Sequence, residues 1–188
     1  MIDVSLAFIA QILDRYLRLQ LGLDHTLVVL NSLVNADGST PEKNQNKVVI
    51  TLINLEYESN RQFYGANLAF AQQQVRVNPP VVFNLDLIIS AQFDDYAESL
   101  KLLSLIAGFF QENPGLSRNS FPTMPASLPN LSVEIESSNS SKTHNLWTAL
   151  GAKYLPSIMY KVRQVPIQGK QIQLANQAIS DTSSGVEL

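Results

Sequence analysis

Apolar residues recur along the chain with two different periods, and these periods predict its secondary structure. In residues 2–21 they follow the spacing of three to four residues that is typical of an amphipathic helix, and Gly22 stands where a helix-ending glycine is expected. The apolar positions are Ile2, Leu6, Ile9, Leu13, Tyr16, Leu17 and Leu21, and the face is widened by Val4, Phe8, Ile12 and Leu19. So wide an apolar face predicts burial on more than one side, either inside the domain or against a second subunit.

The other apolar segments predict strands and two further helices. Residues 81–93 alternate between an apolar face and a face that carries Asn84 and Asp86, which predicts a strand. Residues 47–56 are apolar almost without interruption, which is typical of a strand near the centre of a sheet. Shorter strands are predicted at 26–30, 131–136 and 158–165. Helices are predicted at 95–111, capped by Asp94 and Asp95, and between Thr143 and Pro156 around Trp147.

Two polar segments complete the chain. Residues 57–78 are rich in Gln and Asn and are predicted to form a long surface loop. Beyond Pro166 the chain is polar again, and we expect it to be mobile in isolation. We therefore predict one domain over residues 1–165 and a polar C-terminal arm over 166–188. The fold class is α/β (α+β), a single domain with a mixed or antiparallel sheet flanked by helices.

Composition narrows the classes of function. Charged residues make up 15% of the chain, against about 25% in an average protein, so either partners cover part of the surface or Asn, Gln and Ser take the place of charges. The net charge is −3 and no Lys/Arg cluster is present, which disfavours nucleic-acid binding. No apolar run is long enough for a membrane span, and no export signal is evident, so we expect cytoplasmic synthesis and assembly. Cysteine is absent, which excludes disulfides.

The residues that usually carry chemistry form no recognisable constellation. His25 and His144 have no ligand partners at helical spacing, so no metal site is predicted. The chain has no Gly-x-Ser-x-Gly elbow and no phosphate-binding glycine loop. Glu134 and Glu136 share one strand face, which favours a solvated sheet face over an acid–base pair. We therefore expect no enzymatic activity, no cofactor and no small-molecule substrate.

Several segments together resemble a known family. They are the first helix; the strand at 46–56; Asn78-Pro79-Pro80 with the strand that follows; the helix that ends at Asn113-Pro114; Leu146-Trp147-Thr148-Ala149-Leu150; and Tyr154-Leu155-Pro156-Ser157 with Tyr160-Lys161-Val162-Arg163. In order and spacing they resemble the cap, or tail terminator, proteins of extracellular contractile injection systems, specifically the N-terminal domain family. The resemblance covers residues 1–165 and leaves the segment after Pro166 without a counterpart.

The resemblance implies a structural function and a phage tail-terminator-like fold. Such proteins form a ring, usually of six subunits, that ends the inner tube and sheath, fixes the length of the particle and performs no catalysis. The implied partners are further copies of the chain, the sheath protein and the inner tube protein, in a particle that is either released or anchored at a membrane. The candidate interface residues are Phe8, Ile12, Phe63, Tyr64, Phe70, Tyr160, Val162, Arg163 and Val165.

The strand at 158–165, with the polar arm after it, is the candidate for edge pairing with sheath subunits. Two alternatives stay open. One is an adaptor or assembly chaperone of a secreted particle that closes no ring. The other is a small-molecule-binding or hydrolytic α/β domain, which requires a pocket with convergent polar groups.

Overall fold

Three long antiparallel strands form the centre of the molecule. The computed structural model describes residues 1–58, 67–70, 73–76, 80–169 and 173–174. The long strands are β2 (Lys47–Tyr57), β5 (Val81–Gln92) and β8 (Ser157–Ile167). They belong to a six-stranded sheet of order β1-β2-β5-β8-β7-β6, completed by β1 (Val28–Leu30), β6 (Gly115–Leu116) and β7 (Leu131–Ile135). Only β1 runs parallel to its neighbour, so the predicted mixed sheet is confirmed.

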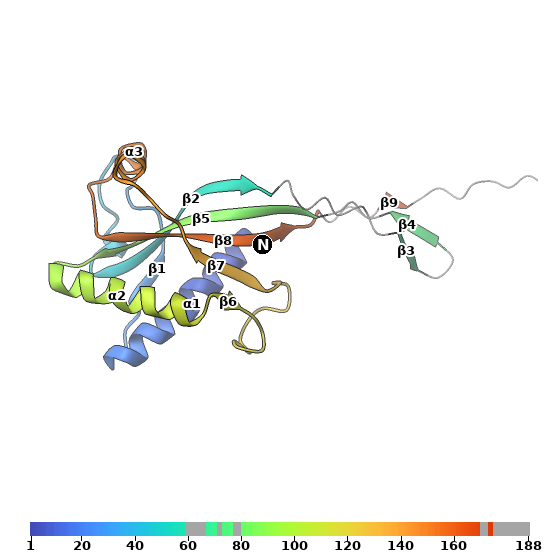
Figure 1. The fold of residues 1–188 in the computed structure, drawn as a ribbon, viewed down its shortest axis with the longest axis horizontal. Coiled ribbons are helices and arrows are strands. Elements are labelled where there is room, and N and C mark those ends of the chain that lie inside the picture. Colours follow the sequence, from blue (N-terminus) through green and yellow to red (C-terminus); the bar gives the residue numbers. More distant parts are fainter. Residues whose placement is uncertain (59–66, 71–72, 77–79, 170–172, 175–188) are drawn as a thin grey trace, which may run out of the picture.

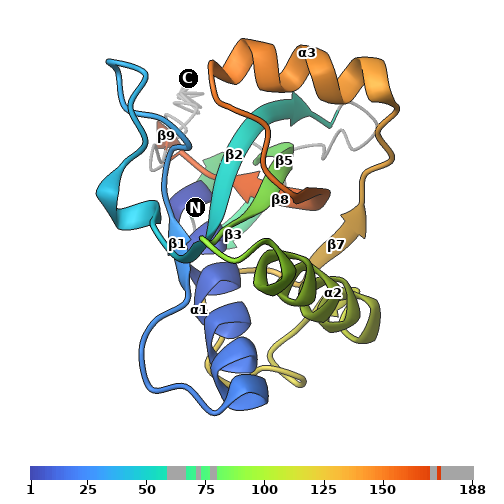
Figure 2. The same cartoon turned by 90° about the vertical axis from the view of Figure 1, so that its left-hand side faces the viewer.

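Helices cover both faces of this sheet (Figures 1 and 2). α1 (Ile2–Leu21) and α2 (Tyr96–Glu112) lie on one face, and α3 (Ser140–Leu150) lies on the other. A single 3-10 turn, η1 (Glu42–Asn44), precedes β2. The larger core lies between the sheet and the α1–α2 pair, and a smaller core lies under α3. Among the described residues, no helix combines the length and the apolar character that crossing a bilayer requires.

The sequence signals for helix ends were right for two of the three helices. α1 ends at Gly22, whose φ of 65° is the left-handed conformation that glycine adopts without strain. α2 begins after Asp95, whose carboxylate accepts a hydrogen bond from the Ala97 N–H, as predicted. α3 begins earlier than predicted, because Asn139 caps it by accepting from the Lys142 N–H at 2.8 Å. It also ends earlier, at Gly151, so the prediction of a helix from Thr143 to Pro156 was wrong at both ends.

The segment predicted as a long loop contains a β-hairpin. β3 (Asn67–Phe70) and β4 (Gln73–Arg76) pair antiparallel, and β9 (Gln173–Leu174) pairs with β4, inside the segment predicted to be a mobile arm. The order β3-β4-β9 repeats the order β2-β5-β8, and each small strand adjoins its long strand in the sequence. Figure 1 shows this second sheet beyond the ends of the three long strands. The division of the chain at residue 165 stays a prediction, and β8 itself runs to Ile167.

Candidate assembly surface

The three long strands change character along their length. We call Val48–Leu52, Leu87–Ala91 and Ser157–Tyr160 the proximal half, and Asn54–Tyr57, Val81–Asp86 and Lys161–Ile167 the distal half. The proximal half is covered on both faces. On the face away from α1, the Trp147 indole of α3 packs in one cluster with Val49, Ile88 and Met159, and only 5% of its surface is exposed.

Two β-bulges mark the boundary between the halves. Leu52 pairs with Leu87 and Asn54 with Asp86, so Ile53 is an extra residue in β2. On the other side of β5, Leu85 pairs with Val162 and Phe83 with Val165, so β8 places two residues opposite Asn84. Bulges of this kind bend a strand and increase the local twist. The distal half therefore leaves the layer that the helices cover.

Asn84 holds the second bulge in place. Gln164, in the bulge, has a φ of 64° and donates its backbone N–H to the Asn84 Oδ1 at 3.1 Å. The Asn84 Nδ2 donates to the Glu58 Oε2 at 3.0 Å. Only 3% of Asn84 is exposed, and its amide uses both its acceptor and its donor. A side chain with only one of these functions could not link both strands to β5.

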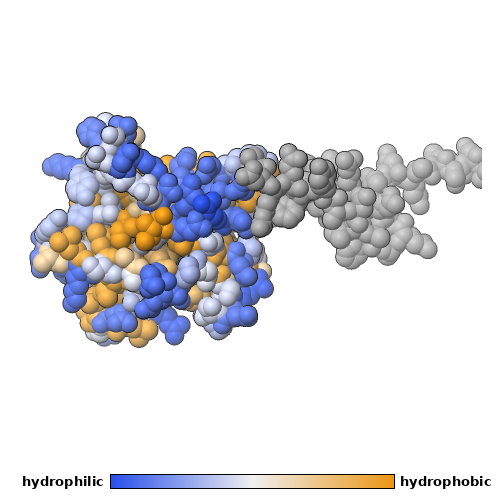
Figure 3. All heavy atoms as spheres, viewed as in Figure 1, coloured by the Kyte–Doolittle hydropathy of each residue, from blue (hydrophilic) through white to orange (hydrophobic). Residues whose placement is uncertain are grey.

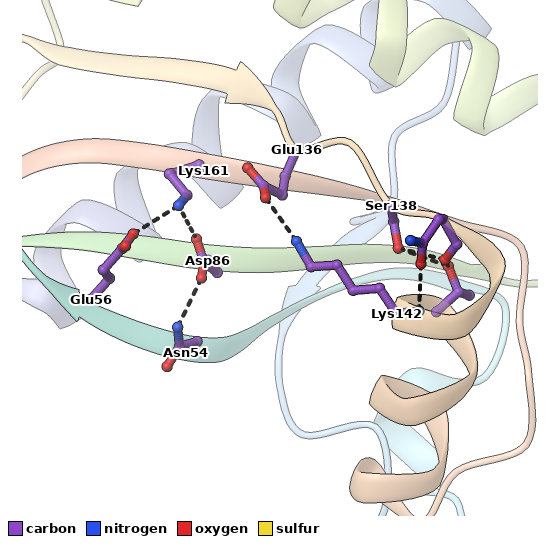
Figure 4. A network of polar contacts seen from close by, with 9 residues as sticks. Asn54, Glu56, Asp86, Glu136, Ser138, Lys142 and Lys161 are labelled. Atoms are coloured by element: carbon purple, nitrogen blue, oxygen red, sulfur yellow. Dashed lines mark hydrogen bonds and ion pairs between the residues drawn. The ribbon is translucent and has the colours of Figure 1, made fainter.

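A network of charged side chains lies on the distal half, on the face away from α1 (Figure 4). The Lys161 Nζ lies 2.7 Å from the Glu56 Oε2 and 3.5 Å from the Asp86 Oδ1. The Asn54 Nδ2 donates to the other oxygen of Asp86 at 3.0 Å. The hydrogen bond to Glu56 raises the pKa of Lys161, and the charge of Asp86 adds to the rise, against a smaller opposing effect of desolvation. Three strands are therefore connected by one ammonium group.

Two further ion pairs extend the network towards β7 and α3. The Arg163 Nε donates to the Glu134 Oε2 at 2.7 Å, across the β7–β8 pair. The Lys142 Nζ lies 2.8 Å from the Glu136 Oε1, which ties the first turn of α3 to the end of β7 and lowers the pKa of Glu136. With Glu58, this face carries five carboxylates and three cations, a net charge of −2. We call it the charged face. Figure 3 shows hydrophilic residues over this region and an apolar strip between α3 and α2.

Five of the predicted interface residues lie in the core of the subunit itself. They are Phe8, Ile12, Tyr160, Val162 and Val165, each at most 6% exposed. The wide apolar face of α1 has a reason within the domain. Phe8 packs edge-on against Phe121, and Tyr16 against Phe109, so the helix is buried by the sheet and also by α2 and the loop after it. An interface requires surface residues, so these five are corrected to core residues.

The other predicted residues have different positions. Arg163 lies on the charged face with its side chain 40% exposed, and it is retained as a candidate. Phe63 and Tyr64 lie outside the described residues, and the side chain of Phe70 in β3 does too. The strand at 158–165, the candidate for edge pairing, has no free edge from Tyr160 to Arg163, because β7 pairs with β8 there and β5 pairs with its other side. Sequence reasoning missed Glu56, Asp86 and Lys161, although polar or charged residues alternate with apolar or aromatic ones at 54–57, 84–87 and 160–163.

Comparison with known proteins identifies the family. The family described as the Pvc16 N-terminal domain matches residues 6–181. The chain belongs to this family. The Pvc16 N-terminal domain fold is also found in two solved structures. A sheath/tube terminator of the extracellular contractile injection system PVC, in the extended state, matches with a TM-score of 0.62 and 16% identity. The tube-terminating cap of the anti-feeding prophage matches with a TM-score of 0.59 and 14% identity.

The matches cover almost all of this chain but only part of each solved protein. The chain is covered over 100% and 99% of its length, but it spans only 64% and 61% of the terminator and the cap, less than two thirds of either. Among curated proteins, none matches the chain. The predicted tail-terminator-like fold is confirmed, and the similar proteins are structural components of particles. Within the described part of the chain, no group of His, Cys, Asp and Glu residues is arranged to hold a metal ion.

Proposed function

We propose that this Pvc16 N-terminal domain ends the inner tube and sheath of a contractile injection system as part of a cap. Its copies close into a ring, expected to contain six subunits, that stops polymerisation and fixes the length of the particle. The observation that carries this proposal is the family match over residues 6–181, joined to a fold shared with a sheath/tube terminator over the whole chain. The proposed partners are further copies of the chain, the sheath protein and the inner tube protein.

The surface of the domain supports an assembly role. Most of the charged face lies on the distal half of the sheet, which no described helix covers, and its ion pairs hold the side chains in place. Arg163 and Glu134 are each partly exposed, so their charges can reach a partner while they remain paired. Surface ion pairs contribute little to stability, about 0–1 kcal/mol each, so folding alone gives a weak account of such a network.

The first experiment measures mass and tube-end binding. The purified protein is passed through size exclusion with light scattering, and the peak is imaged by negative stain. A closed ring with six times the 20.8 kDa mass of the chain is expected, alone or on the ends of isolated inner tubes. Addition to polymerising tube and sheath should place the protein at one end and narrow the distribution of lengths. Binding along the sides of tubes, or lengths that do not change, would count against the proposal.

A pair of charge reversals tests whether the charged face takes part. Arg163→Glu reverses a charge within the network, and Lys153→Glu makes the same change at an exposed position outside it. Both variants should fold like the parent protein. We expect Arg163→Glu to lower the fraction of capped ends and Lys153→Glu to leave it unchanged. Equal capping by all three proteins would remove the charged face from the proposal and leave the capping function untouched.

The segment after β8 is the proposed attachment point for the sheath. Deletion of residues 167–188 is expected to abolish sheath attachment at the cap while tube-end binding continues. The measurement is sedimentation of sheath with capped tubes. Because the deletion also removes β9, the partner of β4, a second variant that retains residues 167–174 separates the loss of that pairing from the loss of the residues beyond it. Unchanged attachment in both truncations would contradict this part of the proposal.

A further inference from the structure

Among the residues that the structure describes, the outer edge of β2 has no partner strand over its distal half. β1 pairs with β2 only from Val48 to Ile50. The Asn31 N–H then donates to the Ile50 carbonyl at 3.2 Å, and the Thr51 Oγ1 donates to the Asn31 carbonyl at 2.6 Å. One residue later the chain leaves the sheet, where Asn44 donates to the Ser32 carbonyl. From Asn54 to Tyr57, no described residue pairs with this edge.

The register determines which backbone groups face outward. The Glu58 N–H donates to the Val82 carbonyl at 2.9 Å, and Glu56 and Asn54 lie at alternate positions of the same ladder opposite Asn84 and Asp86. In an antiparallel pair, alternate residues bond to the partner strand and those between them point away from it. The N–H and C=O groups of Leu55 and Tyr57 therefore point to the open edge. Before the bulge at Ile53 the parity is the opposite, which is why Val48 and Ile50 bond to β1.

The side chains along this edge form two unlike faces. Leu55 and Tyr57 lie on the apolar side with exposed fractions of 44% and 59%, next to Val81 at 45%. Glu56 and Glu58 lie on the other side, and β2 carries no cation after Lys47. Natural proteins usually protect an open edge with lysine, proline or a covering segment. The stretch Asn54–Tyr57 contains neither of these residues.

We propose that the edge Asn54–Tyr57 accepts an extended strand of another protein subunit, which carries apolar side chains on one face and Lys or Arg on the other. The backbone of that strand would bond to Leu55 and Tyr57. Its apolar side chains would extend the surface of Leu55, Tyr57 and Val81, and its cations would face Glu56 and Glu58. The proposal rests on the proposed function only in taking the donor of the strand to be a component of the same particle.

A second copy of the chain is a poorer occupant of this edge. At the opposite end of the sheet, the short strand β6 covers the start of the outer edge of β7, and the Val133 N–H donates to the Pro114 carbonyl at 2.8 Å. Gly115 and Leu116 pair with Ser132 and Leu131. Within the described six-stranded sheet, this leaves only Ile135 facing outward at that end, which is too short for a ladder. Pairing of this edge with the same edge of a second copy would bring Glu56 and Glu58 of the two copies together, and like charges across a strand pair are destabilising. We therefore take the complementary strand to come from a different sequence.

The experiment titrates a synthetic strand into isotopically labelled protein. The probe is a capped peptide of about eight alternating valine and lysine residues, the length of an ordinary strand. We expect the amides of Leu55 and Tyr57 to shift and to gain protection from hydrogen exchange, while those of Val48 and Ile50 stay unchanged. A peptide of alternating valine and glutamate should bind more weakly. Binding without changes at Leu55 and Tyr57, or no binding at all, would overturn the proposal.

A proline variant isolates the edge from the fold. Leu55→Pro removes an N–H that points outward and leaves the ladder with β5 intact, because proline is tolerated on the open side of an edge strand. Leu55→Val keeps the N–H and is the matched control. We expect Leu55→Pro to weaken peptide binding about tenfold, the effect of one lost hydrogen bond, with little change in melting temperature. Equal binding by the two variants would contradict the proposal.

A charge reversal keeps the proposal testable if the proline variant fails to fold. Glu56→Lys leaves the backbone unchanged and should invert the preference, so that the valine–glutamate peptide binds better than the valine–lysine peptide. Protection of Leu55 and Tyr57 by self-association alone, without peptide, would assign the edge to a second copy and overturn the stated partner. These titrations contain no tube. Tube capping without peptide binding would contradict only this inference. Peptide binding without tube capping would contradict only the proposed function.

Discussion

The proximal and distal halves of the sheet are built from the same three strands and have opposite surroundings. In the proximal half, β5 contributes Leu87 and Ile89 to the core under α1 and α2, and Ile88 to the core under α3. In the distal half, β5 contributes Asp86 and Asn84 to a face that no described helix covers. The strands are continuous through the boundary, so a rigid, doubly covered core supports an open surface. The contact surface proposed above is therefore positioned by the part of the domain that has a core on both faces.

The difference arises at the two bulges. The two bulges lie on either side of β5 and close together. Ile53 of β2 lies between the pairs that β2 makes with Asp86 and Leu87, and Arg163–Gln164 of β8 lie opposite Asn84. Because each bulge shifts the alternation of its strand by one, side chains that would continue the core pattern are redirected to the other face. The position of Glu56 on the charged face and the outward backbone of Leu55 both follow from the Ile53 bulge.

Removal of the anchor of the small core should have the largest effect. Trp147→Ala leaves a cavity above Val49, Ile88 and Met159, so we expect a loss of about 3–5 kcal/mol in the free energy of unfolding. Tyr57→Ala, in the distal half, removes a side chain that is 59% exposed and should cost about 0.5–1 kcal/mol. The measurement is urea unfolding followed by circular dichroism, since Trp147 is the only tryptophan. Similar losses in the two variants would refute the contrast between the halves.

Disruption of the bulge that Asn84 holds should have an intermediate effect. Asn84→Ala leaves the Gln164 N–H without its acceptor and removes the hydrogen bond that Asn84 donates to Glu58, so we expect a loss of about 1–3 kcal/mol. Asn54→Ala removes an exposed amide that, among the described residues, bonds to Asp86 alone, and it is the matched control, with an expected loss under about 1 kcal/mol. Hydrogen exchange should accelerate at Gln164 in the first variant alone. Faster exchange throughout the proximal half would mean that the halves are not separable.

The sequence predicted the elements that carry a local signal. Gly22 and Asp95 act on their own helix ends through backbone conformation and a short-range hydrogen bond, and both were predicted correctly. The start of α3 was missed because Asn139 and Thr143 are both capable caps. In the structure the Thr143 hydroxyl donates to the Asn139 carbonyl, so the residue that seemed to begin the helix lies in its first turn. The hairpin β3–β4 was missed because its strands have only four residues each and neither alternates: β3 carries three apolar residues in succession, and β4 begins with two glutamines.

The candidate surface was less predictable, for a physical reason. A wide apolar face on a helix has the same pattern whether a sheet or a second subunit covers it, so Phe8 and Ile12 could not be assigned to the core from sequence. Alternation identifies β8 as a strand but does not say which strands lie beside it. Lys161 lies opposite Asp86 in the β5–β8 register, and it meets Glu56 only because the β2–β5 register contains the Ile53 bulge, which no residue type marks.

The smallest effect is expected at Tyr160, a core residue at the boundary between the halves. Its ring is fully buried 4.6 Å from that of Phe110, and its hydroxyl has no hydrogen-bond partner among the described residues. Tyr160→Phe should therefore raise the free energy of unfolding by about 1 kcal/mol at neutral pH, since an unpaired buried hydroxyl is costly. Tyr154→Phe, at an exposed position, should change it little.

The pH dependence of stability tests the same hydroxyl independently. Burial raises the pKa of Tyr160 to about 12, whereas a tyrosine in the unfolded chain titrates near about 10. Between these two pH values the folded protein keeps the Tyr160 proton, whereas the unfolded chain has released it. The contribution of this proton to the free energy of unfolding is therefore complete below about pH 10 and is lost as the pH rises towards 12. The parent protein should lose stability in this window, and Tyr160→Phe should lose less. Two results would contradict this prediction: the same dependence of stability on pH in the parent and in Tyr160→Phe, or a Tyr160→Phe variant that is less stable than the parent at neutral pH. Either would mean that the Tyr160 hydroxyl has a hydrogen-bond partner, so that the core at the boundary is polar where we describe it as apolar.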